Sequence, residues 1–368
     1  MRITELEAIP LALPFREPYV TASGTLERRE TILLRLGTDA GLVGLGEAVP
    51  LSLRGGEMLE GVLRAIGKLA RRLRRVELAA LEGEDPLGAA IDAFVEVAAG
   101  RRLPPPAAAA LETAIFDLAG KVAGMPLWQL LRAEEVEPVE CNATLVAGEP
   151  ASVAAAAESW ANEGFRSFKL KLGTGDDLDQ VAAVREATGE SARIRVDANG
   201  SWALGDATSI LRRLEPLGVE LAEEPVSGLR DLARLRAGTS IPIAADESVS
   251  SPKEAVRAAS AGACDLVGVK LAKVGGIGAA GGIVSALPSY LSSALDGPVG
   301  IAAAAHAAQA IGRIRPDPGL AHGLATQRLF ADGYARRECE LSDGHLHIPT
   351  GPGLGVQVDE AALARLRI

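Results

Sequence analysis

The sequence is poor in the residues that bind nucleic acids. Aromatic residues make up 3% of the 368 residues, and the formal net charge is −10. Binding to nucleic acid needs clustered basic groups for the phosphates and, for single strands, aromatic rings that stack on bases. One basic cluster, Arg71, Arg72, Arg74 and Arg75, lies in a segment with helical periodicity and is typical of a solvated helix face. We therefore expect no nucleic-acid partner.

Cysteines and long apolar runs are also scarce. The three cysteines, Cys141, Cys264 and Cys339, are far apart and show neither a CxxC pair nor a zinc-ligand spacing. The N-terminus does not resemble a signal peptide, and no apolar run reaches the roughly 18 residues that a membrane helix needs. We therefore expect a cytoplasmic protein with no membrane anchor and with buried or incidental thiols.

The N-terminal third has the pattern of strands followed by helices. Residues 3–9, 31–36 and 42–47 have the character of antiparallel strands. Residues 58–75 and 106–132 instead place apolar side chains at helical spacing. Strands that precede helices, rather than alternate with them, indicate an α+β domain.

From residue 139 onwards, short apolar runs alternate with amphipathic helices, which predicts βαβ units and a parallel sheet. Polar residues end successive runs about 25 residues apart, the length of one strand, one helix and two loops: Lys171, Asp197, Glu223, Asp246 and Lys270. Runs at 290–295 and 321–326 continue the series, the latter as an eighth strand. In a closed parallel barrel the carboxyl ends of all strands open on one face, so these side chains should converge.

Three of these residues are acids, Asp197, Glu223 and Asp246, and together they predict a metal site. Carboxylate oxygens without Cys or His are hard ligands that suit Mg²⁺, with Mn²⁺ as a substitute. Three carboxylates brought together without a cation would repel one another. One such acid could equally be a helix N-cap, but three at consecutive strand ends favour a metal.

The lysines add a base to this site. Lys169 and Lys171 are two residues apart on one strand, so both side chains point to the same side. Lys270 reaches the same face from a distant strand. Neighbouring cations and a metal lower the pKa of a lysine towards the value that a general base needs. The set predicts removal of the proton next to a metal-bound carboxylate. A catalytically silent barrel that binds metal and carboxylate is the alternative, but such a binder needs no base.

The motifs occur in the order found in a known family. They resemble those of the muconate lactonizing enzyme subgroup of the enolase superfamily: KLK (169–171), VDAN (196–199), EEP (223–225), ADES (245–248) and KLAK (270–273). The resemblance implies an α/β fold, a modified TIM barrel of the (β/α)₇β type with an α+β capping domain built from both ends of the chain. We expect the capping domain at 1–135, with 332–368 returning to it, and the catalytic barrel at 136–331.

The resemblance also implies roles for individual residues. Asp197, Glu223 and Asp246 would be the Mg²⁺ ligands, and Lys171 and Lys270 would lie on opposite faces of the substrate, with Lys169 tuning Lys171. Surrounding residues would hold these groups or the substrate: Asn199, Glu247, Ser293 and, in a flexible loop at 21–30, Gly24. The expected partner is a small carboxylate, and a homo-oligomer is compatible with these features.

Further segments resemble the o-succinylbenzoate synthases of menaquinone biosynthesis: GEAVPLS (46–52), ALETAIFDLAG (110–120), CNATL (141–145) and SSAL (292–295). This implies a carbon–oxygen lyase that dehydrates 2-succinyl-6-hydroxy-2,4-cyclohexadiene-1-carboxylate through an enediolate. Dipeptide epimerase or N-acylamino acid racemase, and muconate cycloisomerase, are alternatives that use the same proton abstraction. The Asp-x-Asp pair expected in many dipeptide epimerases has no match in 321–330, which counts against the epimerase.

Overall fold

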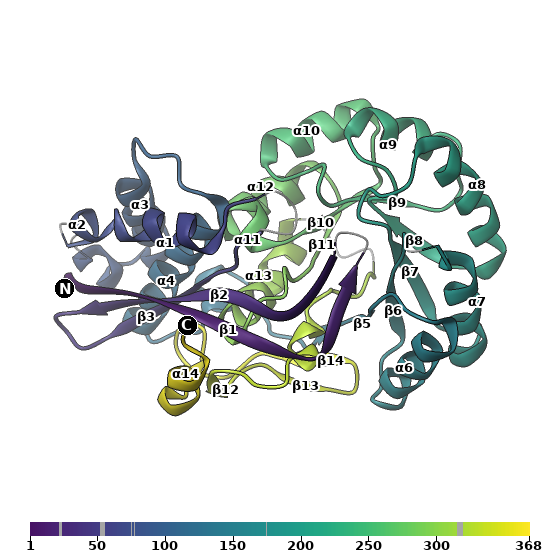
Figure 1. The fold of residues 1–368 in the computed structure, drawn as a ribbon. Coiled ribbons are helices and arrows are strands. Elements are labelled where there is room, and N and C mark those ends of the chain that lie inside the picture. Colours follow the sequence, from purple (N-terminus) through teal and green to yellow (C-terminus); the bar gives the residue numbers. More distant parts are fainter. Residues whose placement is uncertain (22–23, 52–55, 75, 77, 174, 315–318) are drawn as a thin grey trace.

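The computed structural model describes residues 1–21, 24–51, 56–74, 76, 78–173, 175–314 and 319–368. A mixed domain with a three-stranded sheet lies beside a curled parallel barrel surrounded by helices (Figure 1). Both termini lie in the mixed domain, and the C-terminus lies beside its sheet. The predicted fold class, a modified TIM barrel with an α+β cap, is confirmed.

The sheet of the capping domain is antiparallel and consists of β1 (Ile3–Thr21), β2 (Gly24–Thr38) and β3 (Val43–Ala48). Helix α4 (Pro105–Ala123) packs directly on β3. A Cβ atom on Gly44 or Gly46 would clash with backbone carbonyls of α4, so these two glycines permit the close approach. The strands predicted from the sequence are confirmed, and β1 and β2 extend well beyond the predicted ranges.

The helices of this domain differ from the prediction in their boundaries. The predicted helix at 58–75 is two helices, α1 (Leu59–Gly67) and α2 (Ala70–Leu73). The predicted helix at 106–132 is also two, because α4 ends at Gly124, whose φ of 67° is left-handed, before α5 (Leu127–Leu130) begins. Arg75, a member of the basic cluster, lies outside the described residues.

One helix of the capping domain was not predicted, α3 (Pro86–Ala98). Its start is marked in the sequence by Asp85, whose side chain accepts a hydrogen bond from the Gly88 amide at 3.1 Å, and by Pro86 in the first helical turn. A 3₁₀ helix at Ala79–Glu82 precedes it. The start signal of α3 was therefore present in the sequence.

The barrel sheet contains seven parallel strands in sequence order, β5 (Ala143–Leu145), β6 (Ser167–Lys171), β7 (Arg193–Asp197), β8 (Val219–Glu223), β9 (Ile243–Ala245), β10 (Leu266–Val269) and β11 (Ser289–Leu291). The connecting helices are α6 (Pro150–Asn162), α7 (Asp177–Thr188), α8 (Leu204–Leu214), α9 (Leu229–Arg236), α10 (Pro252–Ala261), α11 (Leu271–Val274), α12 (Ile277–Ala286) and α13 (Pro298–Ile314). The predicted alternation of strand and helix is confirmed, and the helices surround the barrel on its outer side (Figure 1).

The eighth strand predicted at 321–326 is wrong as a strand, although its position is right. His322 and Gly323 form only single bridges, to Cys141 on one side and to Ser292 on the other. The His322 amide donates to the Glu140 carbonyl at 2.7 Å, and the Gly323 amide donates to the Leu291 carbonyl at 2.8 Å. A 3₁₀ helix, Ala325–Leu329, follows at once and ends the extended conformation. These bridges close the barrel.

The C-terminal segment packs on both parts of the molecule. Its elements are β12 (Ala335–Arg337), β13 (Glu340–Ser342), β14 (His345–His347), β15 (Gln357–Val358) and α14 (Glu360–Leu366). Strand β14 pairs with β4 (Val139–Glu140) at the entry to the barrel, while Arg367 bridges Leu11 of β1. The chain therefore returns to the capping domain, and the exact boundaries at 135 and 331 remain a prediction.

The three cysteines are buried and unpaired, as predicted. Burial raises the pKa of Cys141 to about 12 and that of Cys264 to about 11, which keeps both thiols protonated. Among the described residues, none of the helices combines the length and the hydropathy needed to cross a bilayer.

Candidate active site

Three acidic side chains meet at the carboxyl ends of neighbouring barrel strands. Asp197 ends β7, Glu223 ends β8, and Asp246 follows β9 directly. Each is at most 1% exposed, and one carboxylate oxygen from each lies within 4.8 Å of the others. The convergence expected from the spacing of these residues is therefore present in the fold. We refer to Asp197, Glu223 and Asp246 as the acidic triad.

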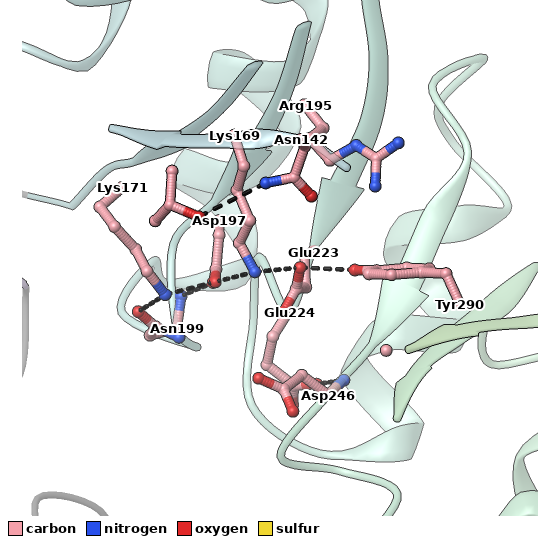
Figure 2. A network of polar contacts seen from close by, with 12 residues as sticks. Asn142, Lys169, Lys171, Arg195, Asp197, Asn199, Glu223, Glu224, Asp246 and Tyr290 are labelled. Atoms are coloured by element: carbon pink, nitrogen blue, oxygen red, sulfur yellow. Dashed lines mark hydrogen bonds and ion pairs between the residues drawn. The ribbon is translucent and has the colours of Figure 1, made fainter. Parts of the chain in front are cut away.

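Lysines from strand β6 contact two members of the triad. The Nζ of Lys169 lies 2.5 Å from Glu223 Oε2 and 2.8 Å from Asp197 Oδ2. The Nζ of Lys171 lies 2.6 Å from Asp197 Oδ2 and donates to Asn199 Oδ1 at 3.1 Å. Figure 2 shows these contacts as one row of alternating acids and lysines. Both lysines point into the barrel mouth, as the two-residue strand period predicts.

The third acid is held by lysines from the opposite side of the mouth. Lys270, directly after β10, pairs with Asp246 Oδ2, and Lys273 lies 2.8 Å from Asp246 Oδ1. Lys273 was missed from the sequence. It lies in the short helix α11, three positions after Lys270, which directly precedes that helix, and the spacing in KLAK carried that signal.

The two charge types control each other's ionisation. Burial would raise the pKa of Asp197, but the ammonium groups of Lys169, Lys171 and Lys270 outweigh burial and hold it well below its usual value. Burial would lower the pKa of Lys169, but the acidic triad outweighs it and raises that pKa. The sequence predicted lowered lysine pKa values. For Lys169 in the protein without metal, the carboxylates raise the pKa instead. A divalent cation on the triad would oppose this effect.

The donor set of the triad fits Mg²⁺. All three residues offer oxygen atoms, which this ion prefers. Among the described residues, Glu223 Oε1 has no hydrogen-bond partner although it is buried, and an orphaned buried oxygen is costly unless a ligand satisfies it. The triad can therefore hold the ion with one oxygen already available.

The floor of the site contains residues that the sequence did not single out. Tyr290 of β11 donates its hydroxyl to Glu223 Oε2 at 2.5 Å. The guanidinium of Arg195 lies 5.2 Å from the centre of the Tyr290 ring and donates to the Ala321 carbonyl at 2.8 Å. Burial, followed by the Glu223 carboxylate, raises the pKa of Tyr290 well above its usual value, so the phenol remains a donor. Figure 2 shows Tyr290 pointing at Glu223.

The loop after β8 supports the third ligand through another unpredicted residue. Glu224 accepts a hydrogen bond from the Asp246 amide at 2.7 Å and also from the Ser248 hydroxyl. Burial raises the pKa of Glu224 to about 7. Its φ of 39° is left-handed, which turns the chain so that Glu223 and Glu224 point to different sides. The second Glu of the EEP motif thus fixes the backbone that carries Asp246.

A cavity of about 210 Å³ opens above the triad. It is lined by all four lysines described above and by further side chains from the barrel and the capping domain, Tyr19, Arg29, Leu51, Glu247, Ser250, Ser293, Leu295 and Thr326 among them. Gly24 lies in the exposed start of β2 and does not line the cavity. Residues 22 and 23 of the predicted cap loop lie outside the described residues.

The other residues named from the sequence are held by neighbours. The side-chain amide of Asn199 donates to Glu247 Oε1 at 3.1 Å, and its backbone amide donates to Asp197 Oδ1 at 3.0 Å. Asn199 therefore connects these two acids. Ser293 donates to Asp296 Oδ2 at 2.8 Å, and the Asp296 amide donates back to the Ser293 hydroxyl. The Ser293 hydroxyl is therefore committed to a local turn at one wall of the cavity.

Two family descriptions match the chain. Residues 3–132 match the family described as "Mandelate racemase / muconate lactonizing enzyme, N-terminal domain", and residues 151–362 match "Enolase C-terminal domain-like". Together these matches cover most of both domains, including every member of the acidic triad and the four lysines, and leave residues 133–150 with β5 between them.

Relatives of known activity match three quarters of the chain or more. L-Ala-D/L-Glu epimerase of Bacillus subtilis is 30% identical over 97% of this chain and 97% of its own length. Muconate cycloisomerase 1 of Pseudomonas putida is 32% identical, with 99% and 98% covered. N-succinyl-L-Arg/Lys racemase of Bacillus cereus is 31% identical, with 75% and 74% covered.

Solved structures of related enzymes have the same fold over the whole chain. Muconate lactonizing enzyme from Pseudomonas fluorescens, complexed with muconolactone, superposes with a TM-score of 0.90 at 29% identity and covers 100% of this chain and 99% of its own. Dipeptide epimerase from Cytophaga hutchinsonii, complexed with Mg and the dipeptide D-Ala-L-Val, superposes with a TM-score of 0.89 at 27% identity and covers 100% and 99%.

Proposed function

This chain belongs to the enolase superfamily, in its muconate lactonizing enzyme subgroup, and from that premise we propose that it is a Mg²⁺-dependent o-succinylbenzoate synthase. The reaction is the dehydration of 2-succinyl-6-hydroxy-2,4-cyclohexadiene-1-carboxylate. One observation carries the proposal: Lys171 and Lys270 line the same cavity, and each is paired with a different member of the acidic triad. A base and a second cation are thereby held on two sides of one space.

The chain's own residues supply the proton transfers. Mg²⁺ on the triad would provide positive charge beside the substrate carboxylate, which makes the neighbouring proton more acidic. Lys171, as a neutral amine, takes that proton and becomes an ammonium group. It then returns the proton to the hydroxyl, which leaves as water while the ring becomes aromatic. Lys270 remains cationic and stabilises the negative charge that develops between the two steps.

Sequence features support dehydration over dipeptide epimerisation. The segment that closes the barrel, residues 321–330, has no Asp-x-Asp pair of the kind expected to hold a dipeptide ammonium. The wall at 292–295 and the segment at 141–145 have the residues expected of the synthases. None of these features concerns the proton abstraction itself, which all members of the subgroup would share.

A second candidate is racemisation of N-acylated amino acids. It is favoured by the 31% identity to the N-succinyl-L-Arg/Lys racemase and by the lysines on two sides of the cavity. In that reaction one lysine removes the proton and the lysine opposite returns a proton to the other face. The two candidates share the first step and differ only in the fate of the enediolate, which loses water in one and is reprotonated in the other.

The proposal is tested by an absorbance assay of water loss from the cyclohexadiene substrate with the Mg²⁺-loaded protein. We expect turnover in the wild type and a loss of about 10³-fold or more in Lys171→Ala, since the base is removed. Calorimetry should show that Lys171→Ala still binds Mg²⁺, whereas Asp197→Asn binds it at least about 100-fold more weakly. Lys253→Ala, an exposed lysine of α10, is the control and should behave as wild type. Retained turnover in Lys171→Ala would contradict the assignment.

A further inference from the structure

The interior of the barrel, below the acidic triad, contains a buried cation. Arg195 lies on β7 two residues before Asp197, so both side chains point into the barrel. Arg195 is fully buried, which removes it from the water that normally stabilises a guanidinium. An apolar side chain of similar size would fill this space without that cost. The role of Arg195 therefore lies in its contacts rather than in its volume.

The contacts of Arg195 connect the barrel closure with Tyr290. Its Nη1 donates to the Ala321 carbonyl at 2.8 Å, in the segment that closes the barrel. Its Nη2 donates to Glu220 Oε2 at 3.2 Å, but the Glu220 side chain is 21% exposed and its charge is partly screened. The guanidinium also lies 5.2 Å from the centre of the Tyr290 ring. Its Nε has no hydrogen-bond partner among the described residues, so acceptors compensate the positive charge only in part.

Tyr290 meets this cation from the opposite side of the barrel. Its strand β11 is separated from β7 by β8, β9 and β10, so the two side chains meet across the interior. Tyr290 is 1% exposed and packs in a cluster with the apolar side chains of Leu221, Ala244 and Leu266. Apolar surroundings strengthen the attraction between a cation and an aromatic ring. The ring is thereby held in one orientation.

The hydroxyl of Tyr290 determines which oxygen of Glu223 is available. Tyr290 donates to Glu223 Oε2 at 2.5 Å, and the Nζ of Lys169 lies 2.5 Å from the same oxygen. Figure 2 shows Lys169 and Tyr290 reaching Glu223 from two sides. Glu223 Oε1 has no hydrogen-bond partner within the part of the chain that the structure describes. Two donors therefore occupy one oxygen of this acid and leave the other for a metal ion.

A glycine makes room for the contact between Tyr290 and Glu223. A Cβ atom on Gly268 of β10 would lie 3.0 Å from the Tyr290 hydroxyl oxygen and 3.6 Å from Glu223 Oε1. The first distance is too short for a relaxed carbon–oxygen contact, so a larger residue would displace the hydroxyl. Glycine at this position leaves both oxygen atoms in place.

We propose that Arg195 is a positioning residue for the metal ligand Glu223 and that it acts through Tyr290. The cation fixes the ring and draws electron density from it, so the hydroxyl is a stronger donor held on Oε2. Glu223 then offers Oε1 to a divalent cation without rearrangement. Arg195 itself does not line the cavity. The proposal rests on the Mg²⁺ site of the proposed function and not on the reaction that follows.

The sign of the effect separates positioning from charge. Removing a buried positive charge near the triad would by itself strengthen the binding of a cation. Loss of positioning weakens it instead. In calorimetric titrations with Mg²⁺ as the only ligand, Arg195→Met should bind the ion about 3-fold to 10-fold more weakly than the wild type, the size of one cation–π contact. Arg195→Lys keeps a charge near the ring and should recover part of the affinity.

A double-mutant cycle shows whether the effect passes through Tyr290. Arg195→Met introduced into Tyr290→Phe should cause no further loss of Mg²⁺ affinity, because the hydroxyl that Arg195 positions is already absent. Arg193→Met is the matched control and should keep the affinity of the wild type. Arg193 lies on the same strand and the same side, but it donates to the Gly319 carbonyl at 2.8 Å and to Glu140, away from the triad.

Three outcomes overturn the assignment of Arg195. They are unchanged or tighter Mg²⁺ binding in the folded Arg195→Met, an equal loss from that change in the Tyr290→Phe background, and a loss of the same size in Arg193→Met. If Arg195→Met does not fold, Arg195→Gln removes the cation, can still donate to the Ala321 carbonyl, and is judged by the same outcomes.

The proposed function fails in a different way. If the cycle gives the expected affinities but the protein does not dehydrate the cyclohexadiene substrate, the reaction is wrong and the positioning role of Arg195 stands. If the wild type does not bind Mg²⁺, both proposals are overturned.

Discussion

Buried carboxylates occur in two regions of the molecule and are stabilised in opposite ways. At the barrel mouth, the acidic triad is surrounded by lysines. At the junction between the capping domain and the barrel, Glu47 and Glu112 are also buried but rely on hydrogen bonds to backbone amides and hydroxyls. In the first region, salt bridges outweigh the cost of burying a charged carboxylate and lower the pKa of Asp197. In the second region, neutral donors offset that cost only in part, so the pKa values of Glu47 and Glu112 stay raised.

The junction acids connect the capping domain to the first turns of barrel helices. Glu112 of α4 accepts hydrogen bonds from the amides of Ile277 and Gly278 at the start of α12. Glu47 of β3 accepts from the amides of Gly297 and Gly300 at the start of α13, at 2.8 Å each. Helix N-termini favour negative charge at such positions. The two domains are thus joined through helix ends rather than through apolar contact alone.

The two regions should respond to pH in opposite directions. The pKa of Asp197 is lowered, so its contribution to stability is present above its unfolded value of 3.8 and is lost as the pH falls. Burial raises the pKa of Glu112 from 4.5 to about 7, so the folded state favours its protonated form. The contribution of Glu112 is therefore present below about 4.5 and is lost as the pH rises through 7.

The largest expected effect comes from removing the shared cation of the mouth. Lys169→Met leaves Asp197 and Glu223 without their common partner, which should destabilise the metal-free protein by about 3–5 kcal/mol. Added Mg²⁺ would replace the lost charge, so thermal unfolding should show a larger Mg²⁺-induced rise in Tm than in the wild type. Lys121→Met removes a lysine that pairs with Asp117 of α4 and should show the wild-type rise. If Mg²⁺ raised the Tm of the wild type and of both variants by the same amount, Lys169 would not be the cation that the metal replaces.

A smaller effect is expected at the junction. The pKa of Glu112 is about 2.5 higher in the folded state than in the unfolded state. Raising the pH from 5 to 8 ionises Glu112 and should therefore lower the free energy of unfolding by up to about 3 kcal/mol. Glu112→Gln cannot ionise, so its stability in urea should fall less over that range. Glu96→Gln, on the exposed face of α3, provides the matched control. If the stability of Glu112→Gln changed with pH in parallel with that of the wild type, Glu112 would not be the source of the pH dependence.

The smallest effect concerns hydroxyl donors to the two kinds of carboxylate. Tyr290→Phe removes the donor that orients Glu223, and we expect Mg²⁺ affinity to fall about tenfold by calorimetry. Tyr334→Phe removes a donor to Glu47 at 2.7 Å in the junction. It should leave Mg²⁺ affinity unchanged while lowering stability by about 1 kcal/mol. An unchanged affinity in Tyr290→Phe would show that Lys169 alone positions Glu223.

The sequence predicted the residues whose placement depends on periodicity. Asp197, Glu223 and Lys270 end strands at regular intervals, so the barrel topology alone brings them together. The two-residue period predicted the shared direction of Lys169 and Lys171. These features depend on local spacing and on one global rule, and both can be read from a single chain.

The residues that were missed depend on contacts between distant segments. Glu112 meets Ile277 and Gly278 across the domain junction, and no local pattern marks that contact. Arg28 and Arg29 are adjacent, and only the register of β2 shows which of them faces the cavity. In the sequence Tyr290 is part of an ordinary apolar strand pattern. Its contact with Glu223 depends on the distance between the two strands in the folded barrel.

The closure of the barrel by two isolated bridges has a consequence for synthesis of the chain. Until residues 322 and 323 leave the ribosome, β5 and β11 are open sheet edges, which attract other strands. Leu11 is likewise synthesised long before its bridge partner Arg367. Both domains therefore gain contacts that join early and late segments of the chain, and the emerging barrel exposes its edges until residues 322 and 323 are available.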